Sequence, residues 1–525
     1  MTKKLILSLS SALLLAIPWL TGLSFTLLFA FVPLLLLQEM RPRRIGGWAA
    51  LTFAVWITAT TWWVGNATML AVVAIPVVGL FFSWIPFMVY HYVWKRGPRG
   101  LAYTVFIAAW ISFEALYMYN EISFPWLTLG YGFGGSHWLV QWYSVTGSFG
   151  GSLWILVANV LCLYAWKNLR IAKWRALVPA VCWILVPIAV SYVMYYTWEP
   201  EDEPVNVTVL QPNIDPYHEK FDSMTQEQQF DILMTLMRQA PQNTDYIVAP
   251  ETALDDRIWL HDMQNHEMIR KFQDTLQAYY SKASLVLGAT TFRLLRPGEP
   301  TSFATRYSQG HSYEICNSAL YIDNVARDPQ GVCDIGVYHK SKLVVGAETV
   351  PYPKVLGLLE KFSIDLGGIS GNFGRHDQRY VFGNPASIAS GTAICYESVY
   401  GEYFNEYVRN GAQIMFIITN DGWWGDTPGY RNHLDFARLR AIETRRSIGR
   451  SANTGISALI DPQGNAVESL GWDQRGQISG TLSLNSKLTP YVRWGDMTAR
   501  VAIFVFFLSI LYFIAWKYRR RQSLA

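Results

Sequence analysis

The chain has 525 residues, of which 51% are hydrophobic and only 16% are charged. An ordinary soluble domain carries about 25% charged residues, so this composition excludes long disordered regions and a purely soluble protein. The net charge of +4 is too small to indicate a nucleic-acid partner, and five cysteines in so long a chain exclude a disulfide scaffold.

Residues 1–200 have the pattern of a membrane domain. Twelve Lys and Arg residues fall in four tight groups, and the stretches between the groups are apolar and aromatic. Since a membrane helix needs roughly 20 apolar residues, we expect seven transmembrane helices here and an eighth in residues 493–525, followed by a basic tail. The expected spans are two within 5–37, two within 46–94, and one each at 101–117, 151–166, 177–196 and 501–516.

The basic groups also predict an orientation. Positively charged loops stay in the cytoplasm, and alternating spans place all four groups and the basic tail on that side, with residues 201–492 on the other. The first apolar segment has an alternative interpretation as a signal peptide, but it lacks a small-x-small cleavage site, so we expect it to be retained. Glu114 and Glu121 lie at the outer end of the fifth span. Ionisable groups in spans are often functional, but we interpret these two as facing water or a headgroup.

Residues 201–492 have the pattern of one large α/β domain. Helical patterns at 225–239, 262–280 and 433–446 alternate with short apolar runs, which favours a sheet with helices on its faces. We also expect antiparallel pairing of 318–323 with 337–343, and of 457–460 with 476–482. The runs that predict buried strands are 205–210, 245–249, 284–289, 392–395 and 414–419.

Three of the predicted strands end in reactive residues: Glu251, Lys340 and Cys395. In open α/β sheets, chemistry occurs beyond the strand C-termini. A thiolate attacks carbonyl groups, a carboxylate accepts its proton, and an ammonium stabilises the thiolate and the developing oxyanion. Each residue alone is a weak signal, because cysteines in strands usually belong to the core. The three together predict thiol-based acyl transfer.

Other motif searches return little. One G-x-G-x-x-G run, at residues 130–135, follows a membrane span and lacks the strand–turn–helix context of a dinucleotide site. The nine histidines are scattered and there is no C-x-x-C pair. We therefore expect no cofactor and no metal.

The motifs in chain order resemble the nitrilase superfamily. They are APE ending at Glu251, YHKSKLVVGAE with Lys340 and Glu348, AICYE with Cys395 and Glu397, and TNDGWWGD at 419–426. With the eight-span frame and FPWLTLGYG at 124–132, the chain is similar to bacterial apolipoprotein N-acyltransferases within that superfamily. The resemblance implies an α-β-β-α sandwich with a Glu–Lys–Cys triad.

The resemblance also implies a reaction and its partners. Cys395 would take an acyl chain from a membrane phospholipid as a thioester and pass it to the α-amino group of the diacylglyceryl-cysteine of an apolipoprotein. Glu251 would be the proton acceptor and Lys340 would stabilise the oxyanion, with Glu348, Tyr396 and Glu397 in support. We expect a monomer of the bacterial inner membrane with its catalytic domain on the periplasmic side. The alternatives are a membrane-tethered nitrilase-like amidase and a non-enzymatic receptor, transporter or scaffold.

Some features depart from the family pattern or stay open. Val345 and Gly346 replace the usual aromatic-containing turn after the lysine, and Phe221 stands where a Trp is usual. Cys316 and Cys333 would lie where disulfides form, but their spacing does not decide whether they pair. Four tryptophans are candidates for contact with the membrane interface: Trp423, Trp424, Trp472 and Trp494.

Overall fold

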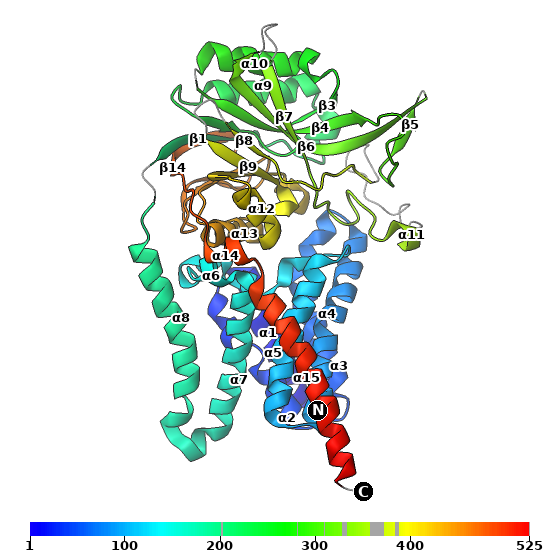
Figure 1. Ribbon diagram of the computed structural model, residues 1–525, viewed down its shortest axis with the longest axis vertical. Helices are drawn as coiled ribbons and strands as arrows, with labels where there is room; N and C mark the ends of the chain where they lie inside the picture. Colours follow the sequence, from blue (N-terminus) through cyan, green and yellow to red (C-terminus); the bar gives the residue numbers. More distant parts are fainter. Residues whose placement is uncertain are drawn as a thin grey trace. The chain divides into compact units, whose positions relative to one another are not determined.

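A computed structural model describes residues 1–525 except 201–202, 281, 309, 328–332, 357–371, 384–387 and 524–525. The chain divides into two compact units. The first, called here the membrane unit, consists of Met1–Trp198 and Trp494–Ala525, and the second, the catalytic unit, is Glu199–Arg493 (Figure 1).

The membrane unit is a set of helices joined by short turns. Six of the described helices are long and apolar enough to cross a membrane: α1, α4, α5, α7, α8 and α15. Its α-helices of eight or more residues are α1 Thr2–Thr21, α2 Val32–Glu39, α3 Ile45–Thr61, α4 Met69–Arg96, α5 Arg99–Tyr119, α7 Ser148–Ala172, α8 Val178–Thr197 and α15 Met497–Gln522.

The helical membrane domain predicted from the sequence is therefore confirmed, with six long spans in place of about eight. Helix α1 ends at Gly22, whose left-handed backbone (φ 78°) closes it. The chain then forms the 3₁₀ turn η1 (Ser24–Phe29) and the short α2, which together make a shorter apolar segment. Helix α3 has 17 residues and lies against α1 and α4. Both extra segments are apolar, which is why composition alone counted them as full spans.

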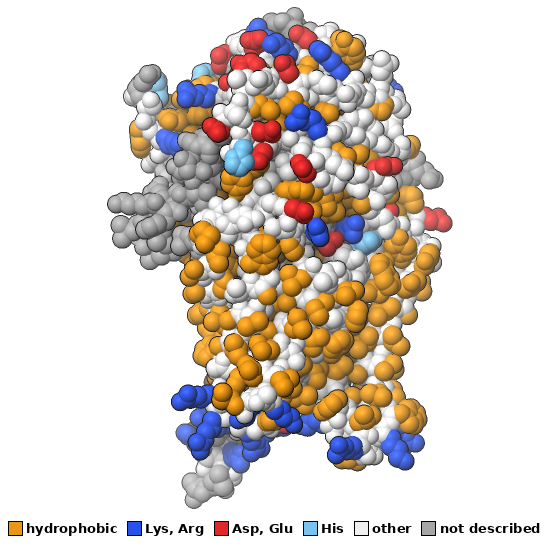
Figure 2. Space-filling model, turned by 180° about the vertical axis from the view of Figure 1, so that it is seen from behind, with side chains coloured by type: hydrophobic (Ala, Val, Ile, Leu, Met, Phe, Trp, Pro, Cys, Tyr) orange, Lys and Arg blue, Asp and Glu red, His pale blue; other side chains and the backbone are white. Residues whose placement is uncertain are grey.

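Lys and Arg side chains gather at one end of the membrane unit, beyond a broad hydrophobic surface (Figure 2). The last turns of α4, α7 and α15 all carry basic residues. Cationic side chains are favourable at helix C-termini and at the edge of a bilayer.

The catalytic unit contains two sheets. Among the described residues, the first has eight strands in the order β14-β1-β2-β4-β6-β5, with β3 beside β4 and β7 beside β6. The bounds are β1 Pro204–Gln211, β2 Tyr246–Val248, β3 Leu254–Trp259, β4 Ser284–Leu294, β5 Arg306–Ser308, β6 His311–Arg327, β7 Cys333–His339 and β14 Gly476–Ser483.

The second sheet has six strands in the order β13-β12-β11-β10-β9-β8, counted over the same residues. The sheets pack face to face: β1 contacts β11 and β12, and the rings of Tyr246 and Phe416 lie 4.9 Å apart. The bounds are β8 Val381–Gly383, β9 Ala389–Ile394, β10 Ile414–Thr419, β11 Ile448–Ala452, β12 Ser457–Ile460 and β13 Ala466–Leu470.

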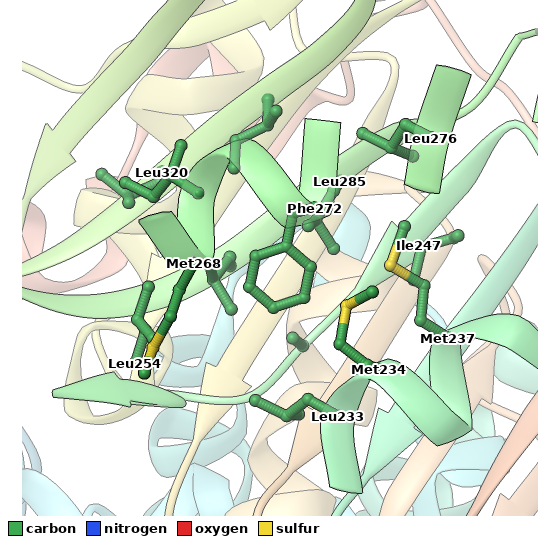
Figure 3. Packing of buried hydrophobic residues seen from close by; sticks show 14 of the residues in the cluster. Leu233, Met234, Met237, Ile247, Leu254, Met268, Phe272, Leu276, Leu285 and Leu320 are labelled. Carbon is green, nitrogen blue, oxygen red and sulfur yellow. The ribbon is translucent and has the colours of Figure 1, made fainter. Parts of the chain in front are cut away.

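Helices cover the outer faces of both sheets and complete an α-β-β-α sandwich, as expected. Helices α9 (Gln226–Arg238) and α10 (Glu267–Tyr279) lie against the first sheet, while α12 (Gly401–Arg409) and α13 (Pro428–Thr444) lie with the second. Phe272 of α10 points into the core between Met234 of α9 and Leu285 of β4 (Figure 3). Apolar residues at helical spacing on α9 and α10 bury this face.

One strand pairing predicted from the sequence is wrong. Residues 457–460 (β12) pair with β13, whereas 476–483 (β14) pair with β1 in the other sheet. The sequence AVESL of β13 is exposed and polar at its centre, so it gave no buried-strand signal. The expected pairing of 318–323 with 337–343 is confirmed as β6 with β7, which ends at His339.

Candidate active site

The three reactive residues predicted from the sequence all follow strand ends. Glu251 follows β2, Lys340 follows β7 directly, and Cys395 follows β9 directly. All three are buried, with exposed fractions of 6%, 1% and 8%. The Lys340 Nζ lies 2.8 Å from Glu251 Oε1, and both charges act on the Cys395 thiol. The fold therefore brings together a carboxylate, an ammonium and a thiol that lie up to 144 positions apart in the sequence (251 to 395).

Glu251 is held by donors from three different segments. Its Oε1 accepts hydrogen bonds from Lys340 Nζ and from Asn317 Nδ2, both at 2.8 Å. Its Oε2 accepts the Asn420 backbone N–H at 3.1 Å. Gly288 of β4 allows this position, because a Cβ there would lie 2.6 Å from the Glu251 Cα. The carboxylate is fixed in orientation by these contacts.

Glu348 is a second carboxylate on Lys340. Its Oε1 accepts from Lys340 Nζ at 2.9 Å and from Asn317 Nδ2 at 2.9 Å, and its Oε2 accepts the Val344 N–H at 2.8 Å. The turn that carries Glu348 closes through Gly346, whose left-handed backbone (φ 84°) suits glycine. The unusual Val345-Gly346 pair therefore builds the turn that presents Glu348 to Lys340.

The charges of this cluster set the protonation of its members. Burial by itself lowers the pKa of the Lys340 ammonium, but the carboxylates of Glu251 and Glu348 raise that pKa well above its ordinary value. Burial, and then the negative charge of Glu251, raise the pKa of the Cys395 thiol well above its ordinary value, although Lys340 opposes the shift. At neutral pH the cluster therefore holds an ammonium beside a protonated thiol.

Cys395 lies at a sharp bend between a strand and a turn. Its backbone is left-handed (φ 50°), which is unusual for a residue with a side chain. The 3₁₀ turn η9 (Cys395–Val399) begins there, and Ser398 Oγ donates to the Cys395 carbonyl at 2.7 Å. Tyr396 is buried next to it, with its ring 5.3 Å from that of Tyr400. The bend lifts the thiol out of the sheet, a geometry also used by other nucleophiles at strand ends.

Glu397 is a fully buried carboxylate that ties this turn to the lysine segment. Its Oε1 accepts the Ser341 N–H at 2.7 Å and its Oε2 accepts the Ile394 N–H at 2.9 Å. Tyr338 and Tyr403 donate their hydroxyls to Oε1 at 2.6 and 2.5 Å. Burial, followed by the charge of Glu397, raises the pKa of both tyrosines well above the ordinary value, so they remain donors.

A further buried cluster supports the bend from the other side. Asp421 Oδ1 accepts from His433 Nδ1 at 2.9 Å, and Asp421 Oδ2 accepts from Arg450 at 2.6 Å. His433 Nε2 lies 3.3 Å from the Cys395 carbonyl oxygen and 3.0 Å from Ser398 Oγ. Although burial opposes it, the charges of Arg450 and His433 lower the pKa of Asp421 to about 2.

Asn317, Asn420, His433 and Arg450 were not predicted as site residues. Asn317 lies on β6 and Asn420 directly after β10, so a search of strand ends could have found Asn420. Lys220 is also buried, and its Nζ donates to the Thr252 carbonyl at 2.7 Å, next to Glu251. The side chain of its neighbour Phe221 lies outside the described residues.

Cysteine pairing and metal binding are the remaining questions raised by the sequence. Cys316 is a buried free thiol. In the β6–β7 register Cys333 lies opposite Arg327, far along β6 from Cys316. The side chain of Cys333 lies outside the described residues. No group of three or more His, Cys, Asp or Glu side chains suited to a metal occurs in the described part of the chain. Of the four tryptophans singled out above, Trp472 stacks on Tyr430, Trp424 lies edge-on to His433 and Trp423 to Tyr217, while Trp494 is 56% exposed.

Comparison with known proteins finds a family match in each part of the chain. Residues 206–487 match the carbon-nitrogen hydrolase family, and residues 10–161 match the apolipoprotein N-acyltransferase N-terminal domain. The chain is 29% identical to the apolipoprotein N-acyltransferase of Chlorobaculum tepidum over 490 residues, covering 90% of this chain and 89% of the relative. Proteins of the same name from Agrobacterium fabrum (89% and 85% covered) and Geobacter metallireducens (91% and 89% covered) are each 26% identical.

Proposed function

The chain belongs to the carbon-nitrogen hydrolase family, and from this premise we propose that it is an N-acyltransferase that matures bacterial lipoproteins. Its acyl donor is a membrane phospholipid, and its acceptor is the α-amino group of the diacylglyceryl-cysteine at the N-terminus of an apolipoprotein. The observation that carries this proposal is the buried cluster of Glu251, Lys340 and Cys395 in a chain that also has six helices able to cross a membrane.

In the first step, the Cys395 sulfur attacks the carbonyl carbon of the phospholipid ester. Because the raised pKa keeps the thiol protonated, attack and proton transfer to Glu251 are coupled. The Lys340 ammonium is placed to stabilise the oxyanion. The carbon–oxygen ester bond then breaks, the leaving alkoxide takes the proton from Glu251, and a thioester on Cys395 and a lysophospholipid result.

In the second step, the uncharged α-amino group of the lipoprotein attacks the thioester carbon. The carbon–nitrogen bond forms and the carbon–sulfur bond breaks. Glu251 takes a proton from the amine and returns it to the Cys395 sulfur, which restores the resting thiol. The product is an N-acylated lipoprotein. Low exposure of the site limits competing attack by water.

Glu348, Tyr396 and Glu397 act in support. Glu348 shares Lys340 and Asn317 with Glu251, so it holds the ammonium between two carboxylates. Glu397 fixes the turn of Cys395 to the segment of Lys340. Tyr396 directly follows the nucleophile, where its backbone N–H is a candidate donor to the oxyanion.

The location follows from the basic residues and the substrates. Lys and Arg at the ends of α4, α7 and α15 favour a cytoplasmic position for that end of the membrane unit. We assign the catalytic unit to the periplasmic side of the bacterial inner membrane. Both substrates carry acyl chains that are costly to remove from the bilayer, at about 0.8 kcal/mol per CH₂, so the enzyme works at the membrane. We further propose that it works as a monomer.

The test uses the purified full-length protein in phospholipid micelles with a synthetic diacylated lipopeptide. We expect a triacylated peptide and an equal amount of lysophospholipid by mass spectrometry. An N-acetylated lipopeptide, which lacks the attacking amine, is the matched control and should stay unchanged. Release of free fatty acid without triacylated peptide would contradict the proposal and favour the nitrilase-like amidase or hydrolase.

A further inference from the structure

The bend that carries Glu251 has a strained backbone. Thr252, directly after Glu251, lies in the left-handed region with a φ of 47°. This conformation brings the Cβ of an ordinary residue too close to its own chain, and it is a marked outlier for a β-branched residue such as threonine. On one side the bend packs on the bare backbone of Gly288, where a Cβ would lie 2.3 Å from the Pro250 carbonyl oxygen and 2.7 Å from the Thr252 nitrogen. Such a backbone persists only where its surroundings hold it.

Lys220 holds this bend through two hydrogen bonds. Its Nζ donates to the Thr252 carbonyl oxygen at 2.7 Å and to the Thr252 Oγ1 at 2.5 Å. The carbonyl belongs to the backbone and Oγ1 to the side chain, so a single amino group fixes the peptide that follows Thr252 together with the χ1 angle of Thr252. Hydrogen bonds from a charged donor are stronger than those between neutral groups, which makes them able to oppose the strain.

Lys220 is itself held firmly by the loop between β1 and α9. It lies in η6 (Glu219–Ser223), a single turn of π-helix. Its backbone N–H donates to the Asp215 carbonyl at 2.8 Å, and its carbonyl accepts the Gln229 side-chain amide at 2.8 Å. Gln229 is buried near the start of α9, and Lys220 is only 4% exposed. The amino group therefore extends from a backbone that is fixed on both sides. Single π-helical turns of this kind are frequent at functional sites.

The burial of Lys220 is costly. Burial lowers the pKa of its ammonium below the ordinary value, although the carboxylates of Asp255 and Glu251 oppose the shift. A methionine of similar length would avoid this cost, but it has no N–H to donate to Thr252. Lys340 contacts the Glu251 carboxylate directly at 2.8 Å, whereas these two hydrogen bonds of Lys220 go to the next residue along the chain.

The position of the Glu251 carboxylate depends on this bend. Its oxygens accept from Lys340 Nζ and from the Asn420 backbone N–H. Because one peptide joins Glu251 to Thr252, a change in the backbone angles of Thr252 moves the carboxylate relative to both donors. We propose that Lys220 is a positioning residue, which keeps the Glu251 carboxylate on Lys340 and Asn420 by holding Thr252 in its left-handed conformation. Its effect on catalysis rests on the proposed function, whereas its effect on the position of Glu251 is measurable without any acyl donor.

The first test is hydrogen exchange of the Asn420 backbone N–H, which donates to Glu251 Oε2. Exchange is measured residue by residue, by mass spectrometry with fragmentation, on the full-length protein in detergent micelles. Since displacement of Glu251 frees this N–H, Lys220→Met should speed its exchange at least about tenfold. Unchanged exchange at Asn420 in Lys220→Met would overturn the proposal.

Two controls separate positioning from general loosening of the catalytic unit. The N–H of the next residue, Asp421, donates to the Thr454 carbonyl at 3.1 Å, so its exchange should stay the same in Lys220→Met. Lys282→Met, at an exposed lysine of the same unit, should change neither amide. Equal acceleration at Asn420 and Asp421 in Lys220→Met would mean that Lys220 only supports the fold, and would overturn the proposal.

Thr252→Ala is a milder variant that leaves the buried lysine in place. It removes the Oγ1 acceptor and keeps the carbonyl acceptor, so exchange at Asn420 should rise about threefold. This variant decides the question even where Lys220→Met does not fold. Exchange at Asn420 that is the same in Thr252→Ala as in the wild type would overturn the proposal.

The second test is rescue of catalysis. Lys220→Met should lower kcat of acyl transfer about 30-fold and leave KM within about twofold, because a displaced proton acceptor slows the chemistry and not the binding. Adding Thr252→Gly to Lys220→Met should recover at least about fivefold in kcat, because glycine adopts a positive φ without strain. A double variant no faster than Lys220→Met would overturn the proposal. Wild-type protein that transfers no acyl group would instead refute the proposed function, and exchange at Asn420 would still decide whether Lys220 positions Glu251.

Discussion

The two units of the molecule differ in where their charged side chains lie. In the membrane unit, Lys and Arg lie at helix ends, and Glu114 is the one acidic residue within the six described spans. In the catalytic unit, several charges lie in the interior. Lys340 is 1% exposed, and Glu397, Asp421 and Arg450 are fully buried.

The difference shows what a buried charge requires. Transfer of an unpaired charge into a protein interior costs several kcal/mol, so such charges persist only with partners. Three buried charges around Cys395 each have at least two partners: Lys340 has two carboxylates, Glu397 has backbone and tyrosine donors, and Asp421 has His433 and Arg450. These networks converge on Cys395 and Lys340, which is where the proposed acyl transfer takes place.

The largest effect should come from removing the nucleophile at the centre of these networks. Cys395→Ala should lower the rate of acyl transfer by at least about 10⁴-fold, because no thioester forms. The measurement is triacylated lipopeptide over time by mass spectrometry. Cys316→Ala, which removes the other buried free thiol among the described side chains of the catalytic unit, is the matched control and should stay within about threefold of the wild type. Residual turnover in Cys395→Ala above that of a heat-denatured sample would count against the assignment.

Lys340→Met should have the next largest effect. It removes the ammonium that faces the oxyanion, and the expected loss in kcat is about 10²–10³-fold. The neighbouring Lys342 is partly exposed, and Lys342→Met should cost less than about tenfold. The test is the ratio of the acyl-transfer rates of the two variants, measured under single-turnover conditions. Equal losses would mean that Lys340 acts only through the stability of the unit.

Glu397→Gln and Glu39→Gln compare the two units directly. Glu397 is fully buried and accepts several hydrogen bonds as a carboxylate. Replacing it by the amide of Gln should therefore lower the free energy of unfolding of the catalytic unit by about 3 kcal/mol. Glu39 pairs with the half-exposed Lys167 at 3.1 Å in the membrane unit, where the expected change is below about 1 kcal/mol. Denaturant unfolding of the full-length protein, followed separately by probes in each unit, measures both. Similar changes in the free energy of unfolding for the two variants would contradict the difference proposed between the two units.

His433→Gln tests the positioning of the Cys395 bend. His433 contacts the Cys395 carbonyl and Ser398, not the reacting atoms, so kcat should fall about tenfold while KM stays within about twofold. His433→Asn also carries an amide but has a shorter side chain, so its kcat should be lower than that of His433→Gln. A rise in KM with unchanged kcat would exclude a positioning role.

The smallest expected effect is a displaced pH profile. Burial and Glu251 raise the pKa of the Cys395 thiol, so the thiolate is scarce at neutral pH and increases only as pH rises through the raised value. Alkylation of Cys395 by iodoacetamide should be slow at pH 7 and should still accelerate above about pH 8.5, the ordinary thiol value. Peptide mass spectrometry follows the modification. An alkylation rate that stops increasing below that pH would mean that Lys340 lowers the pKa of the Cys395 thiol more than burial and Glu251 raise it.

Much of the candidate site was predictable because its reactive side chains follow strand ends. Glu251 and Cys395 come at the ends of short apolar runs, and Lys340 comes near the end of the strand predicted through VYHK. The site residues that the sequence did not predict are ones that hydrogen-bond to the reactive residues or to their backbone. Asn317 lies inside a strand and His433 inside a helix, and their value depends on which side chains the fold brings near, which no local pattern encodes.

The errors in the predicted fold have a similar origin. Strand β13 is exposed and lacks an apolar run, so its pairing with β12 was missed. The apolar segments 24–39 and 45–61 were counted as spans because composition reveals neither the 3₁₀ turn η1 that shortens the first nor the short length of α3. Glu114, which was expected to face water or a headgroup, also hydrogen-bonds to the Leu129 backbone N–H and lines a cavity in the membrane unit.

The central claim is that the buried charges of the catalytic unit serve acyl transfer through Cys395. The most direct test is to load the full-length protein with a phospholipid whose acyl chain is isotopically labelled and then to separate it from excess donor. Intact-protein and peptide mass spectrometry should find one labelled acyl group on Cys395, and addition of the diacylated lipopeptide should move the label into the triacylated product. Absence of acyl mass on Cys395, or discharge of the label as free fatty acid at the same rate with and without the lipopeptide, would contradict the account.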